Sequence, residues 1–147
     1  LLRAATRGMF WFAPPGAMGV VSAKAVGIGH VLAAERGRAG ERYILNGENI
    51  SHRALMADVA NVAGVRPPRL VLPRIVMRPA ALLLNAWNAM RSGPPLLDGS
   101  QVDLSARAMC FDGDKATREL GFPLVSARSA VEEAWMWYCE FGLLSPE

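Results

Sequence analysis

The stretch GERYILNGENIS, residues 40–51, decides how the fold is interpreted. Tyr43 to Leu45 predict a short buried strand, Asn46 to Asn49 predict a turn, and Ser51 is a favoured residue for a helix N-cap. A strand must pair its backbone N–H and C=O groups with a neighbour. The other strand signal is Gly19 to Val21, which predicts an edge strand or an extended lead-in. The sequence therefore predicts a strand but contains almost no other strand with which it could form a sheet.

Outside that stretch, helical periodicity and helix-capping residues dominate the sequence. Gly27 and Gly29 weaken the second expected helix by about 1 kcal/mol each relative to Ala, which predicts close packing against a neighbouring backbone. Ser126 and either Asp112 or Asp114 are expected to begin the last two helices. The expected helices cover residues 1–8, 23–36, 51–63, 74–91, 102–108, 112 or 114 to 120, and 126–141.

Composition and charge limit the classes of protein. A chain of 147 residues with 52% hydrophobic and 20% charged residues suffices for one domain, and we expect a single region over residues 1–147. The net charge is +3, and the arginines are spread along the chain. Nucleic-acid-binding proteins concentrate basic residues on one face, so no nucleic-acid partner is expected. The separated residues Cys110, Cys139, His30 and His52 predict no metal site.

The hydrophobic segments do not indicate a membrane-spanning protein. The longest apolar stretch, Ile75 to Trp87, is interrupted by Arg78, Pro79 and Asn85. A spanning helix needs roughly 20 apolar residues, so we expect no transmembrane segment. The N-terminal residues lack the pattern of a secretory signal, and we expect a cytoplasmic protein.

Two motifs bear on catalysis. GIGHVL, which starts at Gly27, begins like the dinucleotide-binding fingerprint G-x-G-x-x-G, but Leu32 holds the position of the third glycine. Neither Tyr43 nor Tyr138 is followed four residues later by Lys, because Gly stands at both positions. The sequence therefore predicts no catalytic and no cofactor-binding residue in this chain.

Several longer patterns follow one another along the chain. GxGH starts at Gly27, GERYIL-x-GEN-[IS] at Gly40, RPPR-x-x-LP at Arg66 and F-D-x-x-KA-x-RELGF at Phe111, with an Ala/Leu-rich helix between the last two. In this order they resemble the C-terminal region of the extended short-chain dehydrogenases/reductases, the NAD(P)-dependent epimerase/dehydratase family. Within that family the chain is most similar to the hopanoid-associated sugar epimerases and next to dihydroflavonol-reductase-like proteins.

The resemblance implies an α/β fold, with the chain as the mostly helical, substrate-side C-terminal part of a Rossmann-type enzyme. The strand at Arg42 to Leu45 would then complete a parallel sheet built by an N-terminal half, which binds NAD or NADP and carries the catalytic Tyr-x-x-x-Lys. That half is not among the 147 residues, so the chain alone is expected to bind no cofactor. The implied activity of the parent is hydride transfer by a sugar epimerase/dehydratase or carbonyl reductase.

Polar residues on otherwise apolar helices are the candidates for substrate contact, namely Arg74, Arg78, Asn85 and Arg107. Nucleotide-sugar members of the family tend to have phosphate-binding arginines at two places. One is near the position of Pro14 to Met18, and the other is shortly before the D-x-x-KA helix. Here only Arg107 lies near the second of those positions. Because a diphosphate is best held by bidentate Arg, we expect a small sugar-like hydroxyl or carbonyl substrate instead.

Two further interpretations remain open at this level. One is a non-catalytic, stand-alone helical binding or regulatory module that self-associates as a homodimer through the strand at Tyr43 to Leu45. The other is a membrane-surface protein that uses Phe10 to Phe12 and Leu82 to Leu84.

Overall fold

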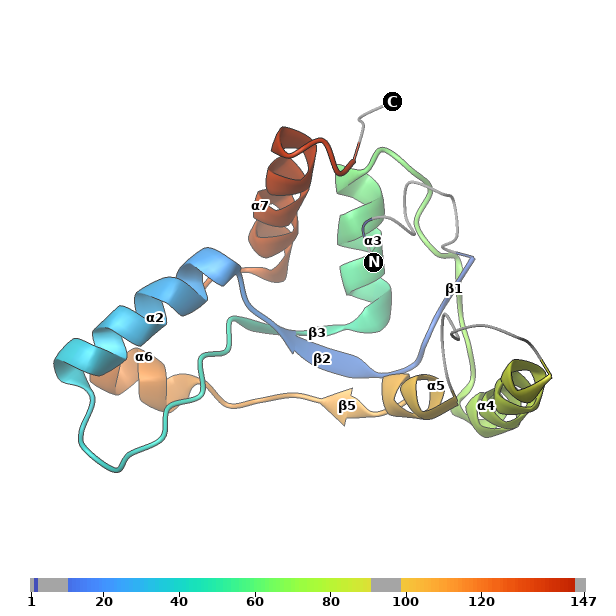
Figure 1. Cartoon of the computed structure of the whole chain (residues 1–147), viewed down its shortest axis with the longest axis horizontal. Helices are drawn as coiled ribbons and strands as arrows, with labels where there is room; N and C mark the ends of the chain where they lie inside the picture. The colour runs from blue at the N-terminus through green and yellow to red at the C-terminus, as the bar shows by residue number, and fades with distance from the viewer. Residues whose placement is uncertain (1, 3–10, 91–98, 145–147) are drawn as a thin grey trace.

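The computed structural model describes residues 2, 11–90 and 99–144 and shows the expected α/β fold (Figure 1). The helices are α2 (Ala23–Arg36), α3 (His52–Val62), α4 (Arg74–Ala89), α5 (Gly99–Ser105), α6 (Asp114–Leu120) and α7 (Ala127–Glu140). The strands are β1 (Phe12–Ala13), β2 (Ala17–Val20), β3 (Glu48–Ser51), β4 (Leu70–Val71) and β5 (Ala108–Met109). Most of the helix expected at residues 1–8 lies outside the described residues.

The strands of the described residues form two small sheets. In the three-stranded sheet, β2 lies between β3, to which it is antiparallel, and β5, to which it is parallel. The second sheet pairs β1 with β4 in parallel. The edge strand predicted at Gly19 to Val21 is confirmed in part: Gly19 and Val20 belong to β2 and pair with β3 alone among the described strands. β5 bonds to the other side of β2 at Ala17 and Met18, which the prediction did not include. Neither neighbour is close in sequence, and local patterns carry no signal for such pairing.

The strand predicted at Tyr43 to Leu45 is not part of either sheet. Residues 41–47 carry no strand assignment, and β3 begins at Glu48, where the sequence predicted a turn. The segment is nevertheless two-faced, since Tyr43 and Leu45 pack toward the α2–α6 core while Ile44 between them is 50% exposed. Side chains that alternate between buried and exposed are typical of a strand. Among the described residues, however, no second strand forms backbone–backbone hydrogen bonds with this segment.

Two helix starts follow the predicted caps. The Ser51 and Ser126 side chains each accept a hydrogen bond from the backbone N–H three residues on, both at 3.2 Å. Ser22, which was not predicted as a cap, does the same for α2 at 3.1 Å. At α6 the N-cap is Gly113, and the predicted capping residue Asp112 instead accepts the Asp114 N–H at 2.8 Å. α5 begins three residues before its predicted start, and α4 ends two residues before its predicted end.

Three pairs of helices surround the central sheet in Figure 1. α3 and α7 lie side by side and bury Leu55, Val59 and Val131. α2 and α6 pack together around Leu120 and Phe122, and α4 packs on α5. None of the helices in the described part of the chain has the length and apolar composition to cross a bilayer.

The two glycines of α2 differ in their surroundings. A Cβ at Gly29 would lie 2.7 Å from a Leu45 methyl group and 2.8 Å from the Phe122 ring. Close packing is therefore confirmed there, but the prediction of a neighbouring backbone was wrong, because the neighbours are side chains. At Gly27 no atom lies within 4 Å of a Cβ, and the same prediction was wrong. Gly27 lies on the exposed side of the helix.

A pair of Gly-to-Ala substitutions measures the close approach of β2 to β5. A Cβ at Gly16 would lie 2.2 Å from the Arg107 carbonyl oxygen and 2.4 Å from that of Ser105, and backbone cannot move as a side-chain tip does. We expect Gly16→Ala to lower the free energy of unfolding by about 1–3 kcal/mol. The matched control Gly27→Ala should raise it by up to about 1 kcal/mol, since Ala is the better helix former. Urea unfolding of both variants tests this, and equal effects would contradict it.

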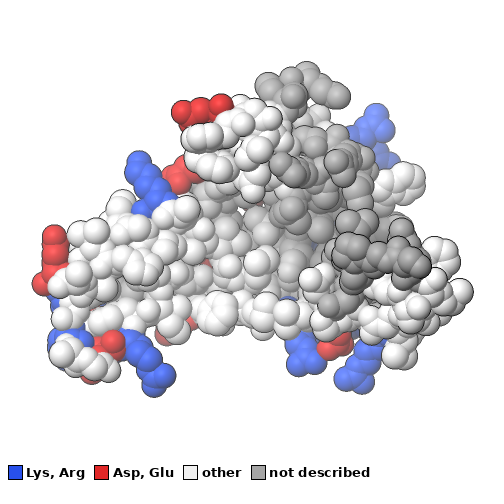
Figure 2. Space-filling view, viewed as in Figure 1, with Lys and Arg blue, Asp and Glu red and all other residues white. Residues whose placement is uncertain are grey.

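Ion pairs fasten the extended segment to α6, where Figure 2 shows acidic and basic groups close together at the left. The Arg38 guanidinium donates to Glu119 at 2.7 Å, the Tyr43 hydroxyl donates to the same carboxylate at 3.0 Å, and Lys115 donates to Glu41. The hydrogen bond from Arg38 lowers the pKa of Glu119 below its ordinary 4.5, and the bond from Lys115 lowers the pKa of Glu41 in the same way.

These lowered pKa values make the attachment acid-sensitive. A carboxylate with a lowered folded-state pKa contributes stability that is complete above its ordinary pKa, 4.5 here, and lost as the pH falls through the lowered value. We expect the urea midpoint to fall between neutral pH and about pH 3, and Glu119→Gln to reduce that fall. The control Glu140→Gln, at an exposed carboxylate at the end of α7, should leave the slope as in the wild type. A wild-type slope in Glu119→Gln would refute the assignment.

Candidate functional site

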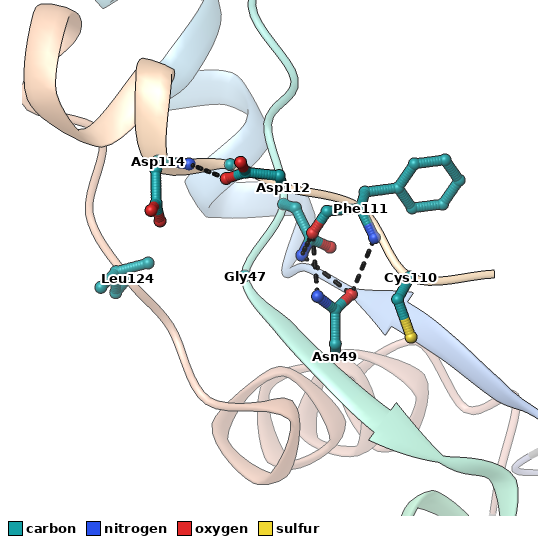
Figure 3. Close-up of a pocket in the computed structure, with 9 residues that line it drawn as sticks. Gly47, Asn49, Cys110, Phe111, Asp112, Asp114 and Leu124 are labelled. Carbon is teal, nitrogen blue, oxygen red and sulfur yellow. Dashed lines mark hydrogen bonds between the residues drawn. The ribbon is translucent and has the colours of Figure 1, made fainter. Parts of the chain in front are cut away.

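A polar pocket of about 430 Å³ lies where the two most specific sequence patterns meet (Figure 3). One wall comes from the chain entering β3 and the other from the chain between β5 and α6. Its lining residues are Asn46, Gly47, Asn49, Cys110, Phe111, Asp112, Gly113, Asp114 and Leu124. We call this site the polar pocket.

Two asparagine side chains join these walls. Asn49 pairs with both backbone groups of Phe111: its Nδ2 donates to the carbonyl at 2.8 Å, and its Oδ1 accepts the N–H at 3.1 Å (Figure 3). Asn46 is buried, and its Nδ2 donates to the Phe111 carbonyl at 3.0 Å and to Asn49 Oδ1 at 3.1 Å. The asparagine side chains thus take the place of the backbone hydrogen bonds that would join two strands here. They hold the two walls of the pocket together.

Glycines make room for this network. A Cβ at Gly19 would lie 2.3 Å from Asn46 Oδ1, and one at Gly47 would lie 2.6 Å from the Val20 carbonyl oxygen and 2.7 Å from that of Val125. At Gly113 the added carbon would lie 3.1 Å from the Asn46 carbonyl oxygen. The glycine of the GEN pattern therefore has a packing role, because three chain segments converge on it.

The open side of the pocket carries acids and apolar groups. Asp112 and Asp114 supply carboxylates, while Phe111 and Leu124 are exposed and supply apolar surfaces. No lysine or arginine is among the described residues that line the pocket. Carboxylates accept hydrogen bonds from hydroxyl groups, and two of them repel a phosphate. The pocket therefore suits a neutral hydroxylated molecule, and within the described residues no group of three or more His, Cys, Asp or Glu could hold a metal ion.

The four residues predicted to contact substrate lie elsewhere, around α4 and α5. Arg74 Nε donates to the Ala106 carbonyl at 3.0 Å, and Arg107 pairs with Asp103 at 2.8 Å. Asn85 Oδ1 accepts the Gly99 N–H at 2.7 Å, where α5 begins.

Arg78 is exposed on α4, and its charge, after the hydrogen bond and the charge of Arg107, helps to lower the pKa of Asp103. Three of the predicted residues thus gather near α5, while Asn85 orders its start. None of the four lines the polar pocket, and their contact with substrate stays a prediction.

Sequence reasoning missed the two asparagines that build the pocket. Asn46 and Asn49 were interpreted as turn residues, because Asn favours turns and sits beside Gly47. Their partner Phe111 is 62 residues away from Asn49. The usable signal was the GEN pattern itself, which belongs to the resemblance and not to local propensity.

Comparisons with known proteins agree with this architecture. No family model matches the chain. Among solved structures, the protein gox2253 is 34% identical and superimposes with a TM-score of 0.76 over 98% of this chain and 44% of its own. A nucleoside-diphosphate-sugar epimerase from Pseudomonas aeruginosa is 26% identical, with a TM-score of 0.74 over 98% of this chain and 42% of its own. These matches support the resemblance of the chain to the C-terminal part of the extended short-chain dehydrogenases/reductases.

Curated relatives point to the same family, NAD-dependent epimerases/dehydratases. A protein described as a dihydroflavonol 4-reductase from Synechocystis sp. is 29% identical over 134 residues, which are 88% of this chain and 39% of the relative. Sterol demethylase protein B of Methylococcus capsulatus is 29% identical over 133 residues, or 88% of this chain and 40% of the relative. The chain thus spans about two fifths of the length of the curated relatives it matches.

The buried amide is the part of the site most sensitive to substitution. Asn46→Ala removes two hydrogen bonds from a residue that is 7% exposed, so we expect it to lower the free energy of unfolding by about 2 kcal/mol. The control Asn61→Ala, at an exposed position of α3, should change it by less than about 0.5 kcal/mol. Denaturant unfolding measures both. A loss in Asn61→Ala as large as that in Asn46→Ala would show that the network is not what stabilises this region.

Proposed function

We propose that the chain is the substrate-binding part of an NAD(P)-dependent sugar epimerase/dehydratase or carbonyl reductase. Hydride transfer would use a cofactor held by a nucleotide-binding half outside these 147 residues. The observation that carries the proposal is coverage: 98% of the chain superimposes on gox2253, yet it accounts for 44% of that protein. The remainder of such a protein is long enough for the half that the chain lacks.

The extended segment at Arg42 to Leu45 supports this proposal. Its inner side chains are packed while Ile44 is half exposed, and no backbone–backbone hydrogen bond satisfies these residues within the described chain. A strand with one covered face and no main-chain partner is suited to joining the edge of a sheet. The proposed nucleotide-binding half would supply that edge.

The substrate is proposed to be a small, uncharged, sugar-like hydroxyl or carbonyl compound. The two carboxylates of the polar pocket and the absence of lysine and arginine from its lining support that class. Two of the predicted substrate contacts are already engaged near α5: Arg74 donates to a backbone carbonyl and Arg107 to a carboxylate. They are therefore less available for bidentate binding of a diphosphate.

The second candidate function is a self-associating, non-catalytic module, and the same unpaired segment favours it. In that case two copies would pair through Tyr43 to Leu45 and bury Ile44 between them. Sedimentation over a range of concentrations separates the candidates, since a monomer that keeps its helix content on dilution would rule out the second.

A chimera tests the first candidate directly. The part of the Pseudomonas aeruginosa epimerase that this chain does not cover is fused to the N-terminus of the chain, and NAD(H) binding is followed by fluorescence. We expect the chimera to bind the cofactor and the chain alone not to bind it. Ile44→Asp should weaken cofactor binding by about tenfold or more, because a charge would be buried where the two parts meet.

The control is Leu104→Asp, at a residue of α5 with similar exposure, 46% against 50% for Ile44. It should leave cofactor binding within about twofold of the unsubstituted chimera. Cofactor binding by the chain alone, or a folded chimera indifferent to Ile44→Asp, would overturn the proposal.

A further inference from the structure

Helix α4 has an apolar face that nothing in the described structure covers. Six large hydrophobic side chains on it are 40–83% exposed: Ile75, Val76, Leu82, Leu83, Trp87 and Met90 just past its end. At about 100° per residue they fall within an arc of roughly 140°. The opposite side, with Met77 and Ala81, is buried, and α4 packs on α5. We call the exposed arc the α4 face.

The sequence around this face contains several arginines and no acidic residue. From Val59 to Leu97 the chain contains five arginines, at positions 66, 69, 74, 78 and 91, and no Asp or Glu. Arg74 and Arg78 lie on the helix beside the edge of the arc formed by Ile75 and Leu82, by the same helical spacing. The nearby Asp103 of α5 is already paired with Arg107. In Figure 2 basic groups, with an acidic group between them, lie along the lower edge of this end of the molecule.

The apolar surface has a second part at the start of α4. Trp11 is 74% exposed and Leu70 is 61% exposed, and both line a groove of about 700 Å³ together with Arg66 and Arg69. Leu70 belongs to β4, three residues before the helix N-cap Pro73. Exposed tryptophan and leucine side chains accompanied by arginines thus occur both in this groove and on α4.

We propose that the α4 face binds the surface of an anionic lipid bilayer, with α4 lying in the plane of the headgroups. An amphipathic helix that has Trp and Leu on one face and arginines beside it is the kind that lies at such an interface. The acid-free segment is attracted by anionic headgroups, whereas two copies of it would bring arginines together. Charge complementarity therefore favours lipid over a second copy of the chain as the partner.

Vesicle flotation tests this inference with the 147-residue chain. Vesicles of equal parts phosphatidylcholine and phosphatidylglycerol are compared with vesicles of phosphatidylcholine alone. We expect co-flotation with the anionic vesicles and its loss on raising the salt concentration. Leu83→Glu should weaken binding by about tenfold or more, and Arg78→Gln by about fivefold. The matched control Val31→Glu, on α2 at 57% exposure, should float as the wild type does.

Other occupants of the face would give different results. A monomeric chain that stays with the soluble fraction, or binds both kinds of vesicle equally, overturns the proposal. If Leu83→Glu abolishes concentration-dependent sedimentation of the chain and leaves flotation unchanged, the partner is a second copy. If the chimera with a nucleotide-binding half does not float while the chain does, that half covers the face and the proposal fails. Cofactor binding by the chimera is read separately, so this inference and the proposed function can fail independently.

Discussion

The paired hydrogen bonds between the Asn49 amide and the backbone of Phe111 are the interaction on which the rest of the structure depends. They join two segments 62 residues apart, and with Asn46 they bring the chain before β3 against the chain before α6. The position of α6 fixes the position of Lys115 and Glu119, which hold the extended segment through Glu41 and Tyr43. The sheet, the polar pocket and the unpaired strand therefore share one support.

Local chemistry made the helices predictable. Ser51 and Ser126 cap the helices they were expected to cap, and Gly121 ends α6 with a φ of 75°, a conformation that favours glycine. Each of these choices involves residues three or four apart, so the sequence contains the whole interaction. The limits of α4 and α5 shifted by two or three residues, and the first residue of α5 has a partner distant in sequence, since its N–H donates to Asn85 of α4.

The sheet and the site were not predictable in the same way. β2 pairs with residues about 30 positions away in β3 and about 90 away in β5, and no local pattern encodes such pairing. The strand signal at Tyr43 to Leu45 was physically correct about side chains, because Tyr43 and Leu45 are packed and Ile44 is not. It was wrong about the sheet, since alternation determines which side chains are buried but supplies no partner for the backbone.

The exposed apolar surfaces at Ile44 and on α4 differ in what they require of a partner. At Ile44 the backbone of Arg42 to Leu45 lacks main-chain partners within the described chain, so an occupant must offer a strand edge as well as apolar contact. On α4 the helix satisfies its own backbone, and an occupant need only cover side chains and accept positive charge. A protein sheet fits the first surface and a lipid headgroup layer fits the second. Because the requirements differ, one molecule can present both surfaces without their competing for the same partner.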